Sequence, residues 1–296
     1  MTRTQANLLL LTAGAMWGMG FVAQSTAMDA IGPLLFIGLR FAIAGLSMLP
    51  FALRESRRAS EPLAGHQWRA FLMIGVLLFG GMTAQQVGLL TTTVTNSGFL
   101  TGLYVVMVPF FGVILFRQWP HRIVWPAALC ALLGIWLLSG GGAVALHVGD
   151  WLTILCAALW ALQVIFIQRS ATGTGRPVTL AVTQFAVTAV IALALAFVFE
   201  PVDIAAIRSA APEIVYAGIF SGGIAFTLQV IGQRYTTASQ AAIFLSTEAV
   251  FAALFAAIFL SERLPAAGLI GCVLIFSAIL LVEIVPALRR QRQPAV

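Results

Sequence analysis

Residues 13–24 read AGAMWGMGFVAQ, and residues 156–166 read CAALWALQVIF. Both stretches are apolar enough to enter a lipid bilayer, yet each carries a tryptophan near its centre, followed by a glutamine. Tryptophan is normally enriched at the membrane surface, so a central indole needs a local explanation. Trp17 and Trp160 are separated by close to half of the 296-residue chain. This spacing indicates an internal repeat.

The composition is that of a membrane protein. Hydrophobic residues make up 60% of the chain, charged residues only 9%, and the mean hydropathy is +1.00. An ordinary soluble domain has about 25% charged residues, so this chain has too little charge to cover a water-facing surface. All 16 basic residues are arginine. Without lysine, the chain cannot complete the phosphate-binding motif of an ATP-hydrolysing pump.

Ten apolar runs are long enough to cross a hydrocarbon core about 30 Å thick, which takes about 20 helical residues. Four runs begin at a proline, which suits a first turn because its missing N–H has no helical partner there. These prolines are Pro33, Pro177, Pro212 and Pro265. The runs are 6–26, 33–53, 69–90, 94–116, 123–141, 150–169, 177–199, 212–232, 238–260 and 265–285. The sequence predicts an all-α integral membrane protein with ten transmembrane helices.

The arginines indicate the orientation of these spans. With the N-terminus in the cytoplasm, only Arg208 and Arg263 fall in outer loops. Cytoplasmic loops carry an excess of basic residues, so both termini are predicted to be cytoplasmic. The arginines of the cytoplasmic segments are Arg3, Arg54, Arg57, Arg58, Arg69, Arg117, Arg122, Arg169, Arg176, Arg234, Arg289, Arg290 and Arg292.

Further features recur in both halves at almost the same offset. The pair Gly80–Gly81 corresponds to Gly222–Gly223, and Gln86 corresponds to Gln229. Five spans per half is an odd number, so the second repeat (146–296) is predicted to be inverted relative to the first (1–145). Inverted repeats are typical of secondary transporters, whose glycine-interrupted spans mark the substrate site. We therefore take both glycine pairs, with Pro109, as predicted hinges; alternatively, the glycines only permit close helix packing.

Longer motifs resemble the EamA family of the drug/metabolite transporter superfamily over nearly the whole chain. The resemblance rests on MWGMGF (16–21), NSGFLTGLYVVMVPFFGVIL (96–115), GDWLTILCAALWAL (149–162) and STEAVFAALFAAIFLSERL (246–264). It implies ten spans in two repeats, and export of amino acids, metabolites or toxic compounds from bacteria across the cytoplasmic (inner) membrane. One branch, the YddG-type exporters, moves aromatic and other amino acids. This chain departs from that branch around Tyr104, so the resemblance leaves the substrate open.

Helical spacing selects the candidate substrate-binding residues. Gly14, Trp17, Phe21 and Gln24 share one helix face, and Trp160 with Gln163 gives a similar pairing. Two facing indoles with nearby amides are expected to line a central cavity for a partly apolar molecule with a polar end. The alternative is that both indoles donate to backbone carbonyls in helix packing. The other candidate substrate-binding residues are Met82, Gln85, Gln86, Thr101, Tyr104 and Gln229.

Two charged residues, Arg40 and Glu248, are predicted to lie within spans. A central charge costs about 2.5–3.5 kcal/mol on insertion scales, so each needs a partner or water. Three interpretations of Glu248 stay open: it binds a substrate amine, it exchanges a coupling proton, or it makes a structural hydrogen bond. Arg40 either holds a glutamate, caps backbone carbonyls or binds a substrate carboxylate. The family resemblance favours a common coupling or structural role for both.

These features predict a secondary exporter of small metabolites, most of all aromatic or neutral amino acids, working by alternating access. Alternatives are a multidrug or nucleotide-sugar carrier of the same superfamily, a passive channel or facilitator, and a membrane enzyme. Clustered acids, bases or metal ligands, which an enzyme would need, are not apparent in the spans. We expect no cofactor, no metal site and no nucleic-acid partner. The expected partners are the substrate and membrane lipid. The protein is expected to be a monomer.

Overall fold

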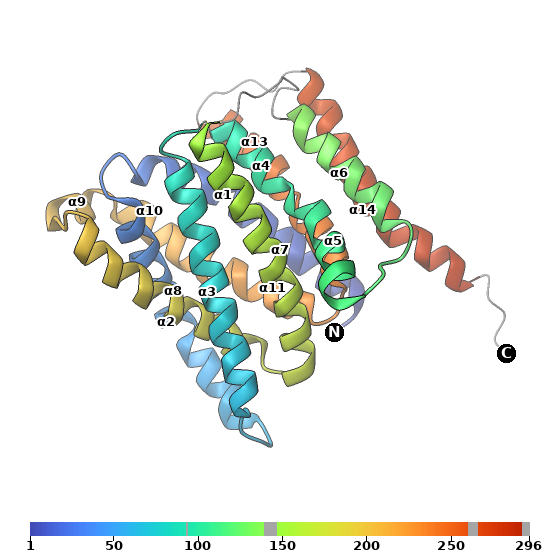
Figure 1. Cartoon of the computed structure of the whole chain (residues 1–296), viewed down its shortest axis with the longest axis horizontal. Coiled ribbons are helices and arrows are strands. Elements are labelled where there is room, and N and C mark those ends of the chain that lie inside the picture. The colour runs from blue at the N-terminus through green and yellow to red at the C-terminus, as the bar shows by residue number, and fades with distance from the viewer. Residues whose placement is uncertain (93, 139–146, 260–265, 292–296) are drawn as a thin grey trace.

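The computed structural model describes residues 1–92, 94–138, 147–259 and 266–291, which are helical and contain no β-strand. Figure 1 shows a helical bundle with α6 and α14 along one side and α2, α3 and α8 towards the other. In chain order the helices are α1 Arg3–Ala27, α2 Pro33–Arg58, α3 Gly65–Gly88, α4 Val94–Gly102, α5 Tyr104–Phe116, α6 Val124–Leu138, α7 Val148–Thr174, α8 Pro177–Phe199, α9 Ile204–Ser209, α10 Ala211–Tyr216, the π-helix η1 Ala217–Ile224, α11 Ala225–Gln233, α12 Ala238–Leu245, α13 Glu248–Phe259 and α14 Ala266–Gln291.

Eight helical segments of the described residues are long and apolar enough to cross a membrane. Two further apolar helices, α6 and the Ala266–Val282 part of α14, are shorter. That α6 and α14 also span the membrane therefore stays a prediction. Residues 139–146, after α6, and residues 260–265, before α14, lie outside the described residues. Helix α8 has the predicted bounds, and α2 continues five residues beyond its expected end.

Three of the four predicted proline starts can be compared with the structure. Pro33 and Pro177 are the first residues of α2 and α8, and Pro212 lies in the first turn of α10. Pro265 lies outside the described residues. The short helix α9 has no counterpart among the predicted spans, because its six residues are too few to cross a bilayer.

Helices α2 and α8 run antiparallel, and each ends near a glutamate that caps the start of the other. Glu200, at the end of α8, accepts hydrogen bonds of 2.8 Å from both backbone N–H groups of residues 34–35. Glu55, near the end of α2, accepts hydrogen bonds of 3.1 and 2.7 Å from the backbone N–H groups of residues 178 and 179. First-turn N–H groups lack helical partners and carry partial positive charge, so each carboxylate stabilises the opposite helix. We call these contacts the reciprocal caps.

Two of the predicted spans are interrupted near their middles. The fourth span divides into α4 and α5 at Leu103, and the ninth divides into α12 and α13 at residues 246–247. At both breaks backbone N–H groups bond three residues back, for example Val106 to Leu103 at 3.0 Å and Ala249 to Ser246 at 3.2 Å. Such bonds tighten a helix locally and interrupt its regular ladder. The two breaks are offset by about the same number of residues as Trp17 and Trp160.

The predicted hinge residues fall in different backbone conformations. Gly80–Gly81 and Pro109 lie inside the continuous helices α3 and α5, so the break at Leu103 precedes Pro109 by six residues. Gly222–Gly223 lie in η1, the π-helix inside the eighth span. A Cβ on Gly222 would stand 2.8 Å from the Ala217 carbonyl oxygen, so the wide π turn needs glycine there. The glycine pairs are therefore not structural equivalents, although their spacing suggests it.

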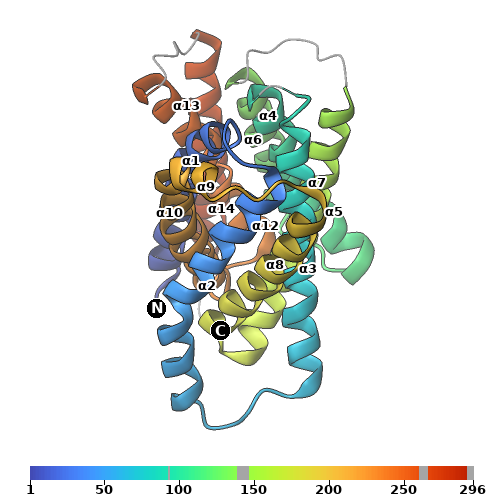
Figure 2. The ribbon, with the colours of Figure 1, turned by 90° about the vertical axis from the view of Figure 1, so that its left-hand side faces the viewer.

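Several connections lie at the same end of the bundle. Figure 2 shows the N-terminus, the α2–α3 connection and the α7–α8 connection towards its lower end. Arg57 and Arg58 close α2, and Arg176 precedes α8, so both connections carry arginine. Arginines from separate parts of the sequence thus lie at one end of the bundle.

Candidate functional site

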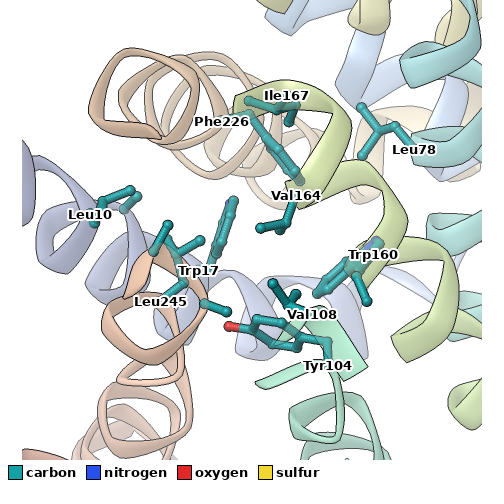
Figure 3. Packing of buried hydrophobic residues seen from close by; sticks show 14 of the residues in the cluster. Leu10, Trp17, Leu78, Tyr104, Val108, Trp160, Val164, Ile167, Phe226 and Leu245 are labelled. Carbon is teal, nitrogen blue, oxygen red and sulfur yellow. The ribbon is translucent and has the colours of Figure 1, made fainter. Parts of the chain in front are cut away.

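Four aromatic side chains meet in the centre of the bundle, as Figure 3 shows. Trp17 of α1 and Trp160 of α7 lie with ring centroids 6.3 Å apart and planes 29° apart. The Phe226 ring is 4.7 Å from Trp17, and the Tyr104 ring meets Trp160 edge-on at 6.4 Å. We call these four residues the aromatic cluster. Its members come from both halves of the chain, and the two indoles face each other as the sequence spacing predicts.

Glycines allow the backbones to approach around this cluster. A Cβ on Gly81 would stand 2.5 Å from Trp160 Cδ1, so the indole lies directly on the α3 backbone. On α1, a Cβ on Gly14 would be 3.3 Å from the backbone nitrogen of Glu248, and one on Gly18 would be 2.6 Å from that of Ala252. Helix α1 therefore packs closely on the interrupted ninth span. The close approach at Gly81 agrees with the packing alternative, and a hinge at Gly81 stays a prediction.

The two indole N–H groups have different environments. Trp17 Nε1 donates to the Ser221 carbonyl oxygen at 3.0 Å, as the packing alternative describes. That carbonyl belongs to η1, where the π turn departs from the regular i−4 ladder. Trp160 Nε1 is buried, and none of the described residues accepts a hydrogen bond from it. An unpaired buried donor is costly, which makes Trp160 the indole that a bound molecule or water would satisfy.

The predicted amides and hydroxyls are all buried, and their bonds leave several atoms unpaired. Gln85 Nε2 donates to Thr101 Oγ1 at 3.1 Å, while Gln163 Nε2 donates to Gln184 Oε1 at the same distance. Gln24 Nε2 bonds only within its own helix, to the Gly20 carbonyl. The unpaired atoms are Gln24 Oε1, Gln85 Oε1, both polar atoms of the Gln86 amide, the Tyr104 hydroxyl and Gln229 Oε1. The core thus holds hydrogen-bonding capacity that the described residues do not use.

Met82 and Phe21 complete the predicted set. Met82 is buried in the same apolar core as the aromatic cluster. Phe21 follows Trp17 by one turn of α1 and is also buried. Thr101 and Tyr104 stand on opposite sides of the break at Leu103, so they do not share one continuous helix face as expected. The break instead makes Tyr104 the first residue of α5.

Arg40 is buried on α2 with incomplete pairing. Its Nη2 donates to Ser221 Oγ at 3.2 Å, whereas Nε and Nη1 have no partner. The rings of Phe41 and Phe36 lie 5.1 and 5.6 Å from its guanidinium carbon, close enough for cation–π attraction. Neither a glutamate nor backbone carbonyls, two of the expected partners, hold Arg40 within the described part of the chain. Ser221 links Arg40 to Trp17, because its side chain and carbonyl receive one bond from each.

Glu248 is 4% exposed, and its Oε2 has no hydrogen-bond partner. It is the first residue of α13, directly after the break in the ninth span. No described residue therefore makes the structural hydrogen bond to Glu248 that the sequence left open. Those residues also contain no group of three His, Cys, Asp or Glu side chains placed to hold a metal ion.

Three contributors to this region are absent from the sequence-based prediction: Ser221, Phe226 and Gln184. Each meets its partner across the fold rather than along one helix, so spacing within a span gives no signal for it. Phe226 has the clearest role, because its ring also lies 5.8 Å from Phe41. The only available signal for Ser221 is its position directly before the glycine pair at 222–223.

Comparison with known proteins agrees with this architecture. The model of the EamA-like transporter family matches twice, at residues 4–140 and 147–284. An uncharacterized transporter of Archaeoglobus fulgidus is 30% identical over 282 residues, covering 95% of this chain and 87% of that protein. A solved crystal structure of 21% identity covers 99% of this chain and 100% of its own, with a TM-score of 0.79, and so shares the fold.

The two family matches lie one in each half of the chain and together cover most of its length. The described helices are apolar enough to cross a membrane several times. The protein is therefore a multi-pass membrane transporter of small molecules. The chain belongs to the EamA-like transporter family.

Proposed function

We propose that this protein is a secondary transporter that exports small amphipathic metabolites, most of all aromatic and neutral amino acids, by alternating access. The observation that carries this proposal is the aromatic cluster, to which both halves of the chain contribute. Apolar ring faces and a few unpaired polar groups, among them Trp160 Nε1 and the Tyr104 hydroxyl, are what a site for an amphipathic molecule requires. The substrate would lie against these groups.

The proposal includes ten spans, with α6 and α14 as the fifth and tenth. These two helices pack on each other closely enough that a Cβ on Gly134 would be 2.6 Å from the Gly271 carbonyl oxygen. Cys130 Sγ also donates to the Leu274 carbonyl at 3.4 Å. Two apolar helices that lie side by side would both cross the membrane or both stay out of it. Their exposed apolar side chains, such as Leu133 and Val273, favour the membrane.

An inverted relation between the two repeats is also part of the proposal. The reciprocal caps support it, because Glu55 and Glu200 perform the same task at opposite ends of an antiparallel pair. The breaks at Leu103 and at 246–247 support it as well, since each interrupts the fourth span of its repeat. Rocking of one repeat against the other would open the site to each side in turn.

The proposed orientation has both termini in the cytoplasm of a bacterial cell, with the protein in the inner membrane as a monomer. The arginine-bearing α2–α3 and α7–α8 connections, which share one end of the bundle with the N-terminus, support this orientation. Export, rather than uptake, rests on the resemblance to family members that remove metabolites from cells.

Counterflow in proteoliposomes tests this function. Vesicles loaded with one unlabelled amino acid at a time would be diluted into a trace of the same labelled compound. A transporter that alternates access accumulates label transiently, and accumulation saturates with substrate. A passive channel gives equilibration without overshoot, which would favour the facilitator alternative. Saturable overshoot with sugars or nucleotides alone would retain a carrier but contradict the amino-acid assignment.

A further inference from the structure

An acidic side chain with one carboxylate oxygen that no described residue satisfies is the least explained polar feature of the aromatic region. Glu248 has an unpaired carboxylate oxygen and stands among helices that also bury the aromatic cluster. Removing a carboxylate from water is costly unless another group satisfies it, and such groups inside membrane bundles mark substrate or ion sites. Arg40 is not its counter-ion, because among the described residues the Arg40 guanidinium donates to Ser221 and to no carboxylate.

Two observations define the level at which Glu248 lies. The start of α13 contacts α1 at Gly14, one turn before the first indole. Helix α12, which ends three residues before Glu248, packs on α5, which begins at Tyr104. The backbone of Glu248 therefore lies one helical turn from Trp17, and the segment before it packs on the helix that carries Tyr104.

Tyr104 and Glu248 hold equivalent positions in the two halves. Each is the first residue of the second part of an interrupted span, namely α5 and α13. Figure 3 shows the Tyr104 hydroxyl pointing from its ring towards Trp17 and Leu245, the last residue of α12. That hydroxyl has no hydrogen-bond partner. Interrupted helices at equivalent positions of two repeats are where repeat-built transporters place ligand groups.

The chemistry around this position favours a positively charged organic group. A carboxylate accepts hydrogen bonds and attracts cations, and the faces of Trp17, Trp160 and Tyr104 attract cations through their ring quadrupoles. A metal ion would require several oxygen, nitrogen or sulfur ligands. The described residues contain no group of three acidic, histidine or cysteine side chains, at Glu248 or elsewhere, that could supply them. A protonated amine needs only one carboxylate, one hydroxyl and aromatic surface.

We infer that Glu248, Tyr104 and the two indoles form the subsite that receives the protonated amine of the transported molecule. The amine donates to the Glu248 carboxylate and the Tyr104 hydroxyl, and its substituents lie against the indole faces. This inference rests on the proposed function and deepens it, because it assigns the polar end of the substrate to one named carboxylate. It selects the amine-binding interpretation of Glu248 among the three that the sequence leaves open.

Ligand-induced stabilisation of the purified full-length protein tests this subsite. The probes are phenethylamine and N-acetyl-phenethylamine, which share the ring but differ in whether the nitrogen carries a positive charge at pH 7. Thermal unfolding in detergent would be recorded against ligand concentration for the wild type, Glu248→Gln, Tyr104→Phe and Glu213→Gln. Glu213 is the control, since it also has an unpaired buried carboxylate oxygen but lies on α10, outside the aromatic cluster.

We expect phenethylamine, and not its acetylated form, to stabilise the wild type and Glu213→Gln. Glu248→Gln should bind phenethylamine about 10- to 100-fold more weakly, because a hydrogen-bonded charge contact is lost. Tyr104→Phe, which removes one oxygen only, should weaken binding by a smaller factor. If Glu248→Gln does not purify as a folded protein, Tyr104→Phe tests the subsite alone. It should bind phenethylamine more weakly than the wild type does.

Equal stabilisation by the acetylated probe, or unchanged amine binding in Glu248→Gln or Tyr104→Phe, would overturn the inference. So would absence of stabilisation by phenethylamine in the wild type. These results leave the transport proposal intact if counterflow of any solute persists. Conversely, amine binding that depends on Glu248 without counterflow of any solute would uphold the subsite and contradict the transport proposal.

Discussion

Replacing Glu200 with glutamine should measurably weaken the attachment of α8 to α2. The Glu200 carboxylate accepts two backbone N–H bonds of 2.8 Å at the start of α2. Hydrogen bonds to charged groups are worth about 1.5–3 kcal/mol each, and neutral ones about 0.5–1.5 kcal/mol. In Glu200→Gln the amide oxygen keeps one neutral bond, and the amide NH2 faces the second N–H without accepting from it.

Because Glu200 is only half buried, water compensates for part of this loss. We therefore expect the free energy of unfolding to fall by about 1–3 kcal/mol, within the range known for helix N-cap removal. Glu55→Gln should cost at least as much, since Glu55 Oε2 additionally accepts from Thr179 Oγ1 at 2.7 Å. The assay is reversible unfolding of the purified protein in mixed micelles, with Asp29→Asn as control. Asp29 is exposed in the connection just before α2, so its replacement removes the same charge without a cap.

The reciprocal caps would be refuted as stabilising contacts if Glu200→Gln and Asp29→Asn unfolded alike. A different result would contradict the symmetry argument: Glu200→Gln destabilises as expected, while Glu55→Gln has no effect. The double variant should lose about the sum of the two single losses, because the caps lie at opposite ends of the helix pair and share no partner.

The remaining predictions concern the aromatic region. Gly81→Ala should destabilise the protein by about 1–3 kcal/mol, because its Cβ would stand 2.5 Å from Trp160, whereas Gly80→Ala meets only a Leu159 methyl group at 3.2 Å. Equal melting temperatures for the two alanine variants would contradict this. Trp17→Phe should lower stability more than Trp160→Phe, by about 1 kcal/mol, because only Trp17 loses an N–H bond. Parallel denaturant titrations compare them, and the reverse order would count against the assigned hydrogen bond.

Much of the membrane architecture could be predicted because it depends on local composition. Apolar runs of span length gave the helices, and Pro33 and Pro177 marked two starts to the residue. The interruptions could not be predicted in this way. Leu103 stands in an apolar stretch without an adjacent proline, and the ninth span breaks at a serine and a threonine whose hydroxyls bond carbonyls three residues back. Such bonds occur in intact helices too, so they do not identify a break in advance.

The candidate site was predicted to the extent that repeat symmetry could reveal it. Trp17 and Trp160 were found because matching positions of two repeats meet at their interface. Phe226 and Ser221 were not predicted, because Trp17, which both contact, lies about 200 residues away on α1. The reciprocal caps were not predicted for the same reason. Glu55 and Glu200 do stand at the ends of their spans, separated by nearly the same number of residues as Trp17 and Trp160. Contacts between distant segments depend on helix packing, which spacing within one span does not determine.

Counterflow with Trp160→Phe tests the central claim, that transport uses the aromatic cluster shared by the two halves. Trp160→Phe retains an aromatic ring and removes an N–H that has no partner among the described residues, so the fold should persist. Trp151→Phe, at a side chain that is 60% exposed on the same helix, is the matched control. We predict that Trp151→Phe exchanges labelled substrate like the wild type, while Trp160→Phe raises the half-saturating concentration about tenfold or more. Unchanged exchange by folded Trp160→Phe would contradict the account.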